Sequence, residues 1–219
     1  MCFSATASFG ASAVLLTIGI IAIKKSTTKP QYLLSCIPLL FCVQQFAEGI
    51  VWLSASHPGI HFLKQPAVYA FLIFAQVIWP VIVPLSIGLL EKEPLRKKIY
   101  TVISGIGILI ALYLSYCLLF YKVSANIECY HIDYILYFPF APAKYSGILY
   151  FIPTVIPPII SSIKSLRLLG LAVLLTYITT KIFYTEYLIS VWCYFSAIIS
   201  ILILFIVIDM NRTKATIRL

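Results

Sequence analysis

Residues 32–54 read YLLSCIPLLFCVQQFAEGIVWLS, and this stretch decides how the chain must fold. It is long enough to cross the bilayer, because about 20 apolar residues in a helix span roughly 30 Å of hydrocarbon. Its polar residues are not scattered: Gln44, Glu48 and Trp52 recur at every fourth position, and Gln45 comes three before the acid. In a helix these side chains share one face. The stretch therefore predicts a membrane-spanning helix with a polar face in the half that ends at Trp52.

The composition of the whole chain agrees with a lipid environment. Of its 219 residues 62% are hydrophobic and 11% are charged, and the mean hydropathy is +1.02. Soluble domains have roughly 45–50% apolar and about 25% charged residues. The net charge of +9 lies in short clusters between apolar runs, whereas nucleic-acid-binding proteins gather it in one patch or stripe. The sequence predicts an integral membrane protein whose partner is the lipid bilayer, and it argues against nucleic acid as a partner.

Seven apolar stretches are visible, and we expect them to form a single domain over residues 1–219. They cover residues 4–23, 32–54, 67–90, 99–121, 147–163, 167–184 and 188–209. The fifth is short and contains Pro153, Pro157 and Pro158, which membrane helices tolerate where neighbouring groups bind the freed carbonyls. The sequence therefore predicts an all-α membrane protein, a seven-transmembrane helix bundle with a kinked fifth span.

The positive charges predict the orientation of this bundle. Twelve of the sixteen Lys and Arg residues follow the odd-numbered stretches: Lys24, Lys25, Lys29, Lys92, Arg96, Lys97, Lys98, Lys164, Arg167, Arg212, Lys214 and Arg218. The other four lie on the opposite side: Lys64, Lys122, Lys144 and Lys181. Cytoplasmic loops are enriched in Lys and Arg. We therefore expect the N-terminus outside, the C-terminus in the cytoplasm, and an uncleaved first span, because its positive charges follow the apolar run.

The longest connection, residues 122–146, has a pattern of its own. Cys129, His131 and Asp133 alternate with aromatic and β-branched residues. A period of two with such residues is typical of a strand or hairpin. The sequence predicts a short hairpin-like cap over the outer mouth of the bundle.

Other stretches add polar and aromatic residues that could line a pocket with the face of residues 32–54. These are Gln76, Trp79, Tyr177, Lys181 and Trp192. Pro80 and Pro84 follow the first two and are compatible either with a simple kink or with a broken helix that lines a cavity. We expect Lys181 to extend to the membrane interface rather than to pair with Glu48.

The beginning of the chain also carries reactive groups. Cys2 stands at the outer edge of the first span, where the helix dipole and the chain's amino group would lower a thiol pKa. Ser4, Ser8 and Ser12 recur at every fourth position, which is the small-residue spacing of tightly packed membrane helices. We expect the start of this span to be wedged among other helices, with Cys2 near the outer ends of the second and seventh spans.

Cys2, Glu48, His131 and Cys193 could therefore meet in one outer pocket. Cysteine, histidine and carboxylate are groups that bind metal ions. Two cysteines on the oxidising side could equally form a disulfide, and the spacing leaves metal, disulfide and neither open. If the pocket performs chemistry, Glu48, Cys2 and His131 are the candidate catalytic residues, and a metal ion is the candidate cofactor.

Four segments carry a family resemblance. They are MCFSATASF at residues 1–9, PLLFCVQQFAEGIVWL at 38–53, IWPVIVPLS at 78–86 and SVWCYFSA at 190–197. Together they resemble an uncharacterised family of bacterial multi-pass membrane proteins whose members begin with nearly the same nonapeptide. The resemblance implies an inner-membrane protein and implies no activity. Its matching positions are Cys2, Ser4, Gln44, Glu48, Trp52, Trp79, Pro80, Pro84, His131, Trp192 and Cys193.

Three functions remain open from the residues. The first is a membrane-embedded enzyme or a metal or thiol site that opens outward. The second is a transporter for small solutes or a proton-linked channel, which the largely apolar inner halves of the spans disfavour. The third is a seven-helix sensor or a scaffold that binds a lipid, a small molecule or a partner.

Overall fold

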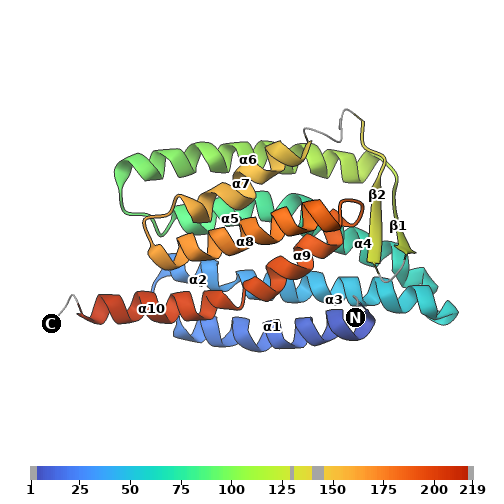
Figure 1. Ribbon diagram of the computed structural model, residues 1–219, viewed down its shortest axis with the longest axis horizontal. Coiled ribbons are helices and arrows are strands. Elements are labelled where there is room, and N and C mark those ends of the chain that lie inside the picture. Colours follow the sequence, from blue (N-terminus) through green and yellow to red (C-terminus); the bar gives the residue numbers. More distant parts are fainter. Residues whose placement is uncertain (1–3, 129–130, 140–145, 217–219) are drawn as a thin grey trace.

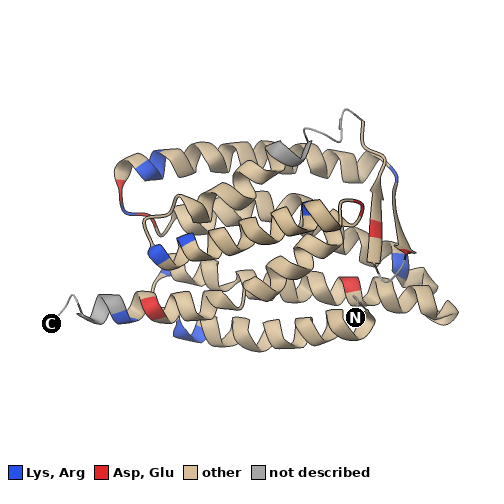
Figure 2. Cartoon of the chain, in the orientation of Figure 1, with Lys and Arg blue, Asp and Glu red and all other residues tan. Residues whose placement is uncertain are grey.

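The computed structural model describes residues 4–128, 131–139 and 146–216. Within them the chain forms long helices that run side by side, with one strand pair at one end (Figure 1). We call the end with the strands the hairpin end. The opposite end, where most of the Lys and Arg positions gather, is called the basic end (Figure 2).

The first helix is α1 (Ala5–Lys25), and the side chain of Ser4 caps it by accepting a backbone hydrogen bond at 3.2 Å. It packs along the helix that follows. Ser8 and Ser12 are buried in this contact, and the Ser12 hydroxyl donates to the Cys42 carbonyl at 2.9 Å. The prediction that the serine stripe packs against other helices is confirmed.

Residues 29–56 form two helices, α2 (Lys29–Ser35) and α3 (Ile37–Ser56). Pro38 stands in the first turn of α3, where its missing N–H leaves no helical partner unpaired. The polar face predicted for this stretch is buried inside the bundle, because Gln44, Gln45 and Glu48 all lie away from solvent and lipid. This face positions the site described below.

The next helical rod is broken. It consists of η1 (Pro58–Leu63), α4 (Lys64–Leu72), η2 (Ile73–Ile78) and α5 (Trp79–Gly88). The η2 segment is a π-helical turn, a rare geometry that often occurs at functional sites. Pro80 follows it and contributes no N–H, so carbonyls of η2 are free to accept other donors. Here the Tyr150 hydroxyl donates to the Ala75 carbonyl. A Cβ on Gly107 would collide with the Pro80 carbonyl, so the helix α6 (Pro94–Phe120) approaches this break closely.

The remaining elements are α6 (Pro94–Phe120), β1 (Val123–Glu128), β2 (His131–Leu136), α7 (Ser146–Ile159), α8 (Lys164–Phe183), α9 (Leu188–Ile199) and α10 (Leu202–Thr216). The strands pair antiparallel, with Val123 opposite Leu136 and Glu128 opposite His131. Ile132 and Tyr134 point inward from β2 and are buried. The hairpin predicted from the period of two is confirmed.

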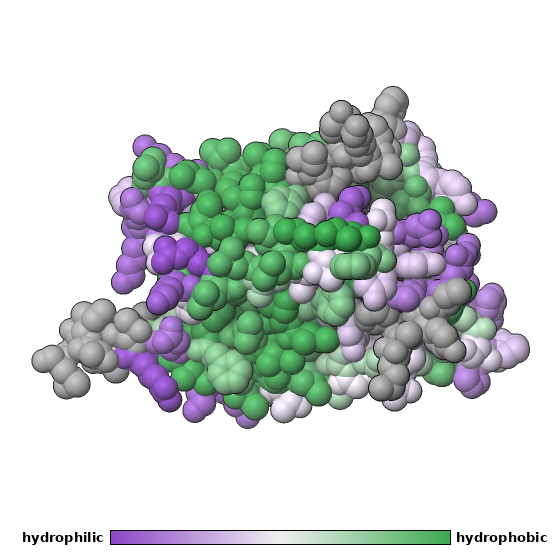
Figure 3. Space-filling view, in the orientation of Figure 1, coloured by the Kyte–Doolittle hydropathy of each residue, from purple (hydrophilic) through white to green (hydrophobic). Residues whose placement is uncertain are grey.

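The face of the bundle seen in Figure 3 is apolar in its middle and polar at both ends. In the described part of the chain, six helices are long and apolar enough to cross a membrane. The apolar part of α7, Leu149–Ile159, is shorter than these. Exposed side chains such as Leu109, Leu119 and Leu175 would be costly in water and are suited to lipid. The prediction of an all-α membrane protein is confirmed at this level.

Candidate functional site

Glu48 is the centre of a buried polar cluster toward the hairpin end. Its side chain is 2% exposed. The Ser190 hydroxyl donates to the Glu48 Oε1 at 2.5 Å. Ser190 lies in the first turn of α9 and Glu48 lies past the middle of α3, so the bond joins two helices that are far apart in the sequence. An acid at this depth is costly and by default marks a functional position.

Two glutamines accompany the acid, and both are fully buried. The Trp79 indole N–H donates to Gln44 Oε1 at 2.8 Å, and the indole stacks on Phe41 with ring centroids 3.9 Å apart. Gln44 Nε2 lies near the Cys193 thiol. The Gln45 amide lies near the Glu48 carboxyl, but neither its nitrogen nor its oxygen makes a well-formed hydrogen bond. The cluster therefore holds more polar atoms than its own hydrogen bonds satisfy.

Further unpartnered polar atoms lie around the same region. The buried atoms without a hydrogen bond in the described residues include Gln44 Nε2, Gln45 Nε2 and Oε1, Trp52 Nε1, Trp192 Nε1 and the Tyr134 hydroxyl. Burial and the nearby Glu48 and Cys193 raise the pKa of Tyr134 well above its ordinary value, so its hydroxyl keeps its proton. Each buried and unpartnered group costs about 1–3 kcal/mol. Natural proteins pair nearly all such groups, so this concentration calls for a functional explanation.

A cavity of about 80 Å³ lies next to the cluster, between α3, α5, α7, α8 and α9. Trp79, Tyr150, Trp192 and Cys193 line the part of it that adjoins the glutamines. Toward the basic end its walls are apolar and include Leu34, Ile87 and Ile203. Among the described residues with unpartnered atoms, Trp192 lines the cavity, whereas Gln44, Gln45 and Trp52 do not.

The predicted pocket residues divide into those that join this region and those that do not. Gln44, Gln45, Glu48, Trp52, Trp79, Trp192 and Cys193 form the cluster or the cavity wall. Tyr177 supports the wall, since its ring packs edge-on against Trp192 with centroids 5.1 Å apart. Gln76 is half-buried on η2, outside the residues that line the cavity. Lys181 is exposed, which agrees with the expectation that it extends outward.

The predicted metal set is not assembled in the described residues. His131 stacks on Tyr187 and packs near Tyr184, with ring centroids 4.7 Å and 5.2 Å away. In the described ranges no three His, Cys, Asp or Glu side chains come together as a metal site, so His131, Glu48 and Cys193 do not form one. Cys193 is a buried free thiol, and the predicted Cys2 lies outside the described residues. The β2 strand directs His131 to the aromatic rings instead of to the carboxylate.

Sequence reasoning missed three residues of the site: Ser190, Tyr134 and Tyr150. Ser190 begins the segment SVWC, which contains the predicted residues Trp192 and Cys193. Because Ser190 stands three residues before Cys193, helix spacing could have placed it on the same face. Tyr134 was visible as an inward position of the strand alternation. Tyr150 had no such signal, because its contact with the Ala75 carbonyl depends on the break at η2.

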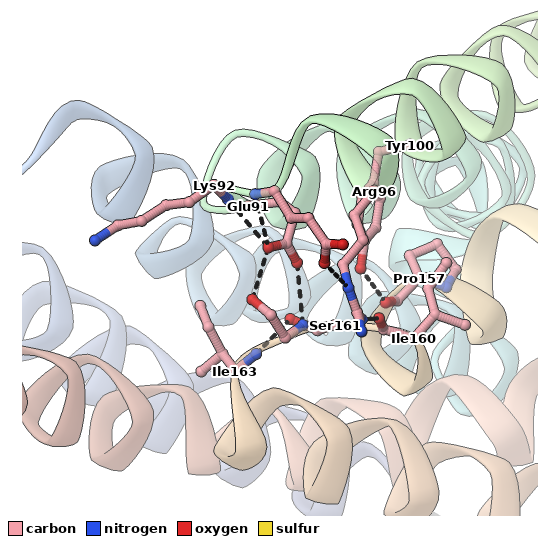
Figure 4. Close-up of polar contacts among 10 residues, drawn as sticks. Glu91, Lys92, Arg96, Tyr100, Pro157, Ile160, Ser161 and Ile163 are labelled. Carbon is pink, nitrogen blue, oxygen red and sulfur yellow. Dashed lines mark hydrogen bonds and ion pairs between the residues drawn. The ribbon is translucent and has the colours of Figure 1, made fainter.

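A second buried carboxylate lies at the basic end and serves as a contrast (Figure 4). Glu91 is 3% exposed and accepts hydrogen bonds from the Ser162 hydroxyl at 2.7 Å, from the Ser162 N–H at 3.0 Å and from the Lys92 N–H at 3.0 Å. Burial alone would raise the pKa of Glu91, but these hydrogen bonds outweigh it and lower the pKa. Beside it Arg96 donates to Glu93 at 2.6 Å and to the Ile160 carbonyl. We call this group the Glu91 clamp, because it joins the α5–α6 and α7–α8 connections.

The fold and the buried cluster define a helical membrane protein with an internal polar site. The chain belongs to the family of unknown function DUF6629, whose sequence profile matches residues 1–218. The expectation of an uncharacterised family covering most of the chain is thereby confirmed. Comparison with curated proteins and with solved structures gave no match.

Proposed function

We propose that the protein crosses the bacterial inner membrane seven times, with its basic end in the cytoplasm. Helix α7 lies in the fifth predicted span and supports one crossing in addition to the six long helices, because it packs against α5, α6 and α8 within the bundle. At 14 residues it is about 21 Å long, and the connections at its ends would complete the crossing. The gathering of Lys and Arg at the basic end supports the orientation (Figure 2).

Reporter fusions to the C-terminus test this topology. A fluorescent reporter, active only in the cytoplasm, should give signal after Leu219, and a phosphatase, active only in the periplasm, should not. The same pair inserted after Lys122 should give the opposite result, which controls for expression. A periplasmic C-terminus would contradict an odd number of crossings.

We further propose that the bundle binds a small amphiphilic molecule, with its polar end at the Glu48 cluster and its apolar chain in the cavity. The observation that carries this proposal is the buried, unpartnered indole N–H of Trp192, a residue that lines a mostly apolar cavity together with Trp79 and Cys193. A ligand with a polar end would satisfy this N–H and regain the roughly 1–3 kcal/mol that it costs unpaired.

The shape of the cavity favours binding over passage of ions or polar solutes. Its walls toward the basic end are mostly hydrocarbon, and the Thr154 and Ser200 hydroxyls there already donate to backbone carbonyls. An ion moving that way would lose most of its hydration without replacement. Its volume of about 80 Å³ is roughly half of the ~150 Å³ that holds one benzene molecule. The cavity therefore suits the first carbon atoms of a chain next to a polar end.

Tryptophan fluorescence provides a direct test, because all three tryptophans, Trp52, Trp79 and Trp192, lie in this region. The probe is a long-chain fatty acid methyl ester brominated along its chain, added to purified protein in mild detergent. Bromine quenches tryptophan at contact distance, so a bound probe should quench with saturation. Probe that only dissolves in the detergent should quench in proportion to its concentration.

A pair of matched variants separates site binding from general partition. Ser196 lines the cavity, so Ser196→Leu should fill it and remove the saturable part of the quenching. Ser115 lies on α6 and is not among the cavity-lining residues, so Ser115→Leu should leave the quenching as in the wild type. Saturable quenching that persists in Ser196→Leu would place the probe elsewhere and overturn the proposal.

A further inference from the structure

Two buried oxygen atoms without partners lie in the contact between α1 and α3. Ser8 is 1% exposed and Gln45 is 0% exposed, and neither Ser8 Oγ nor Gln45 Oε1 makes a hydrogen bond in the described residues. Natural proteins rarely leave such groups unpaired. Neither residue lines the cavity, so a ligand in the cavity does not account for them.

The register of the two helices places these atoms opposite each other. Two contacts fix this register, the bond from Ser12 to the Cys42 carbonyl at 2.9 Å and the packing of Phe9 against Gly49. Gln45 lies between these two α3 positions on the same face of the helix, three residues after the first and four before the second. Ser8 precedes Ser12 by one turn on the same face of α1, so it lies level with Gln45.

The Glu48 carboxyl group adds its oxygens to this pair. The Gln45 amide lies beside it, and the Ser190 hydroxyl donates to its Oε1 at 2.5 Å. Helices α1, α3 and α9 contact one another, so oxygen atoms from three helices gather here. We call Ser8, Gln45, Glu48 and Ser190 the oxygen cluster. It lies apart from the residues that line the cavity.

The charge of Glu48 has no cationic partner in the part of the chain that the structure describes, where the ion pair is that of Arg96 with Glu93. The titratable groups around it are Tyr134 on β2 and Cys193 and Tyr194 on α9. Tyrosine and cysteine side chains supply no positive charge in either protonation state. Buried charges in proteins are paired or coordinate metal ions. One carboxylate balances a monovalent cation, whereas a divalent ion would leave an uncompensated charge in the interior.

We infer that the oxygen cluster binds one Na⁺ ion. Glu48 neutralises the charge of the ion, and the oxygens of Ser8, Gln45 and Ser190 are its neutral ligands. Hard cations take carboxylate and amide oxygens as ligands. A hydroxyl has two acceptor lone pairs besides its hydrogen, so Ser190 binds the ion while it donates to Glu48. The close packing of α1 on α3 favours Na⁺ over the larger K⁺.

This site differs from the metal set predicted from the sequence, because it uses one carboxylate and neither a thiol nor an imidazole. It is also independent of the amphiphile proposed for the cavity, since the two sites share no lining residue. Each can therefore be tested without the other.

Equilibrium binding of radiolabelled Na⁺ to purified protein in detergent tests the inference. The wild type should bind one ion per chain with saturation. Glu48→Gln keeps the shape of the side chain and its bond from Ser190 but removes the charge, so saturable binding should be lost. Ser8→Ala removes one ligand and should weaken binding by about tenfold. Ser12→Ala is the matched control one turn away, and it should bind Na⁺ within about twofold of the wild type, because the Ser12 hydroxyl is already used by Cys42.

Thermal unfolding provides a second readout, compared in NaCl, KCl and choline chloride at equal ionic strength. An ion that binds only the folded state raises the Tm. At a Na⁺ concentration about a hundredfold above the Kd, the Tm of the wild type should be about 5 °C or more higher than in choline chloride. KCl should raise it less, and Glu48→Gln should have the same Tm in all three salts.

Four results would contradict the inference. A wild type without saturable Na⁺ binding and with the same Tm in all three salts would mean that Glu48 is neutralised by a proton. Saturable binding that persists in Glu48→Gln would place the ion elsewhere. An equal loss in Ser12→Ala and Ser8→Ala would show an effect of helix packing and not of a lost ligand. A larger increase of the Tm in KCl than in NaCl would overturn the choice of Na⁺.

Discussion

Two carboxylates, Glu48 and Glu91, are equally buried in this protein and differ in how completely they are hydrogen-bonded. They are 2% and 3% exposed. Glu91 receives bonds on both oxygens from Ser162 and from the neighbouring backbone. Glu48 has one well-formed bond, from Ser190, and is surrounded by amide and indole groups without partners. Burial alone therefore does not distinguish them.

The difference separates a structural role from a binding role. A fully satisfied polar network rigidifies the fold that contains it, and an incompletely satisfied one costs stability. The Glu91 clamp joins the α5–α6 and α7–α8 connections at the basic end, so its hydrogen bonds stabilise the fold. The Glu48 cluster holds donors that make no well-formed hydrogen bond among the described residues, and such a cost persists where function needs it.

The largest expected effect comes from the same substitution at both acids. Glu91→Leu should lower the free energy of unfolding by about 3 kcal/mol, because charged hydrogen bonds are lost, and should lower the Tm by roughly 6–12 °C. In Na⁺-free buffer, Glu48→Leu should lower the free energy of unfolding by only about 1 kcal/mol, and the Tm by roughly 2–4 °C, because only the bond from Ser190 is lost. Thermal unfolding in one detergent compares the two.

The affinity for the brominated ester should be affected in the opposite order, with the larger loss in Glu48→Leu. Glu48→Leu should weaken quenching by the brominated ester by about tenfold or more, since it places hydrocarbon at the polar end of the cavity. Glu91→Leu should leave that affinity unchanged at temperatures where the variant is folded. Equal losses of stability in the two variants would remove the distinction between clamp and site.

The next largest effects are expected for two tryptophans of the site, one with a hydrogen-bond partner and one without. Trp79 donates to Gln44, and the indole N–H of Trp192 has no partner. Trp79→Phe leaves Gln44 Oε1 without its donor and should cost about 1–3 kcal/mol of stability. Trp192→Phe removes an unsatisfied donor and should cost less than about 0.5 kcal/mol, while weakening ester binding by about three- to tenfold. Similar Tm values for both variants would show that the Trp79 bond contributes little.

The polar face of residues 32–54, the hairpin and the break near Pro80 were predictable from the sequence to different degrees. The face of Gln44, Glu48 and Trp52 followed from their spacing of four, because a helix fixes which residues share a side. The hairpin followed from the alternation around His131. At Pro80 the missing N–H was compatible with a kink or with a broken helix, and the π-helical η2 shows that the rod is broken there.

Long-range pairing could not be predicted. Ser190 meets Glu48 only because α9 packs beside α3, and no local pattern encodes that contact. His131 was expected beside the acid, but the strand presents it to Tyr187. Glu91 stands among charged residues in the sequence, and its bonds with Ser162, 71 positions later, form only in the folded protein. Such contacts depend on how helices pack, which spacing within one helix does not specify.

A smaller effect depends on pH and on the Glu91 clamp. Because the folded state lowers the pKa of Glu91 below its ordinary value of 4.5, the carboxylate stabilises the protein at pH values above 4.5. This contribution is lost as the pH falls through the lowered folded-state pKa. The Tm difference between wild type and Glu91→Leu should therefore be constant from pH 7 to about 5 and should shrink at lower pH. A difference that widened on acidification would mean that the protonated acid stabilises the clamp more than the carboxylate does.

The smallest expected effect concerns Tyr134, whose hydroxyl reaches the cluster from the hairpin and has no partner. Tyr134→Phe keeps the ring stacked on Phe71, where the centroids are 4.6 Å apart, and removes only the hydroxyl. We expect a Tm equal to or slightly above that of the wild type, and ester binding weakened by about two- to fivefold. A clear loss of stability without any change in binding would mean that the hydroxyl holds the hairpin to the bundle. The hairpin would then belong with the clamp, as a structural element, and the binding site would consist of helices alone.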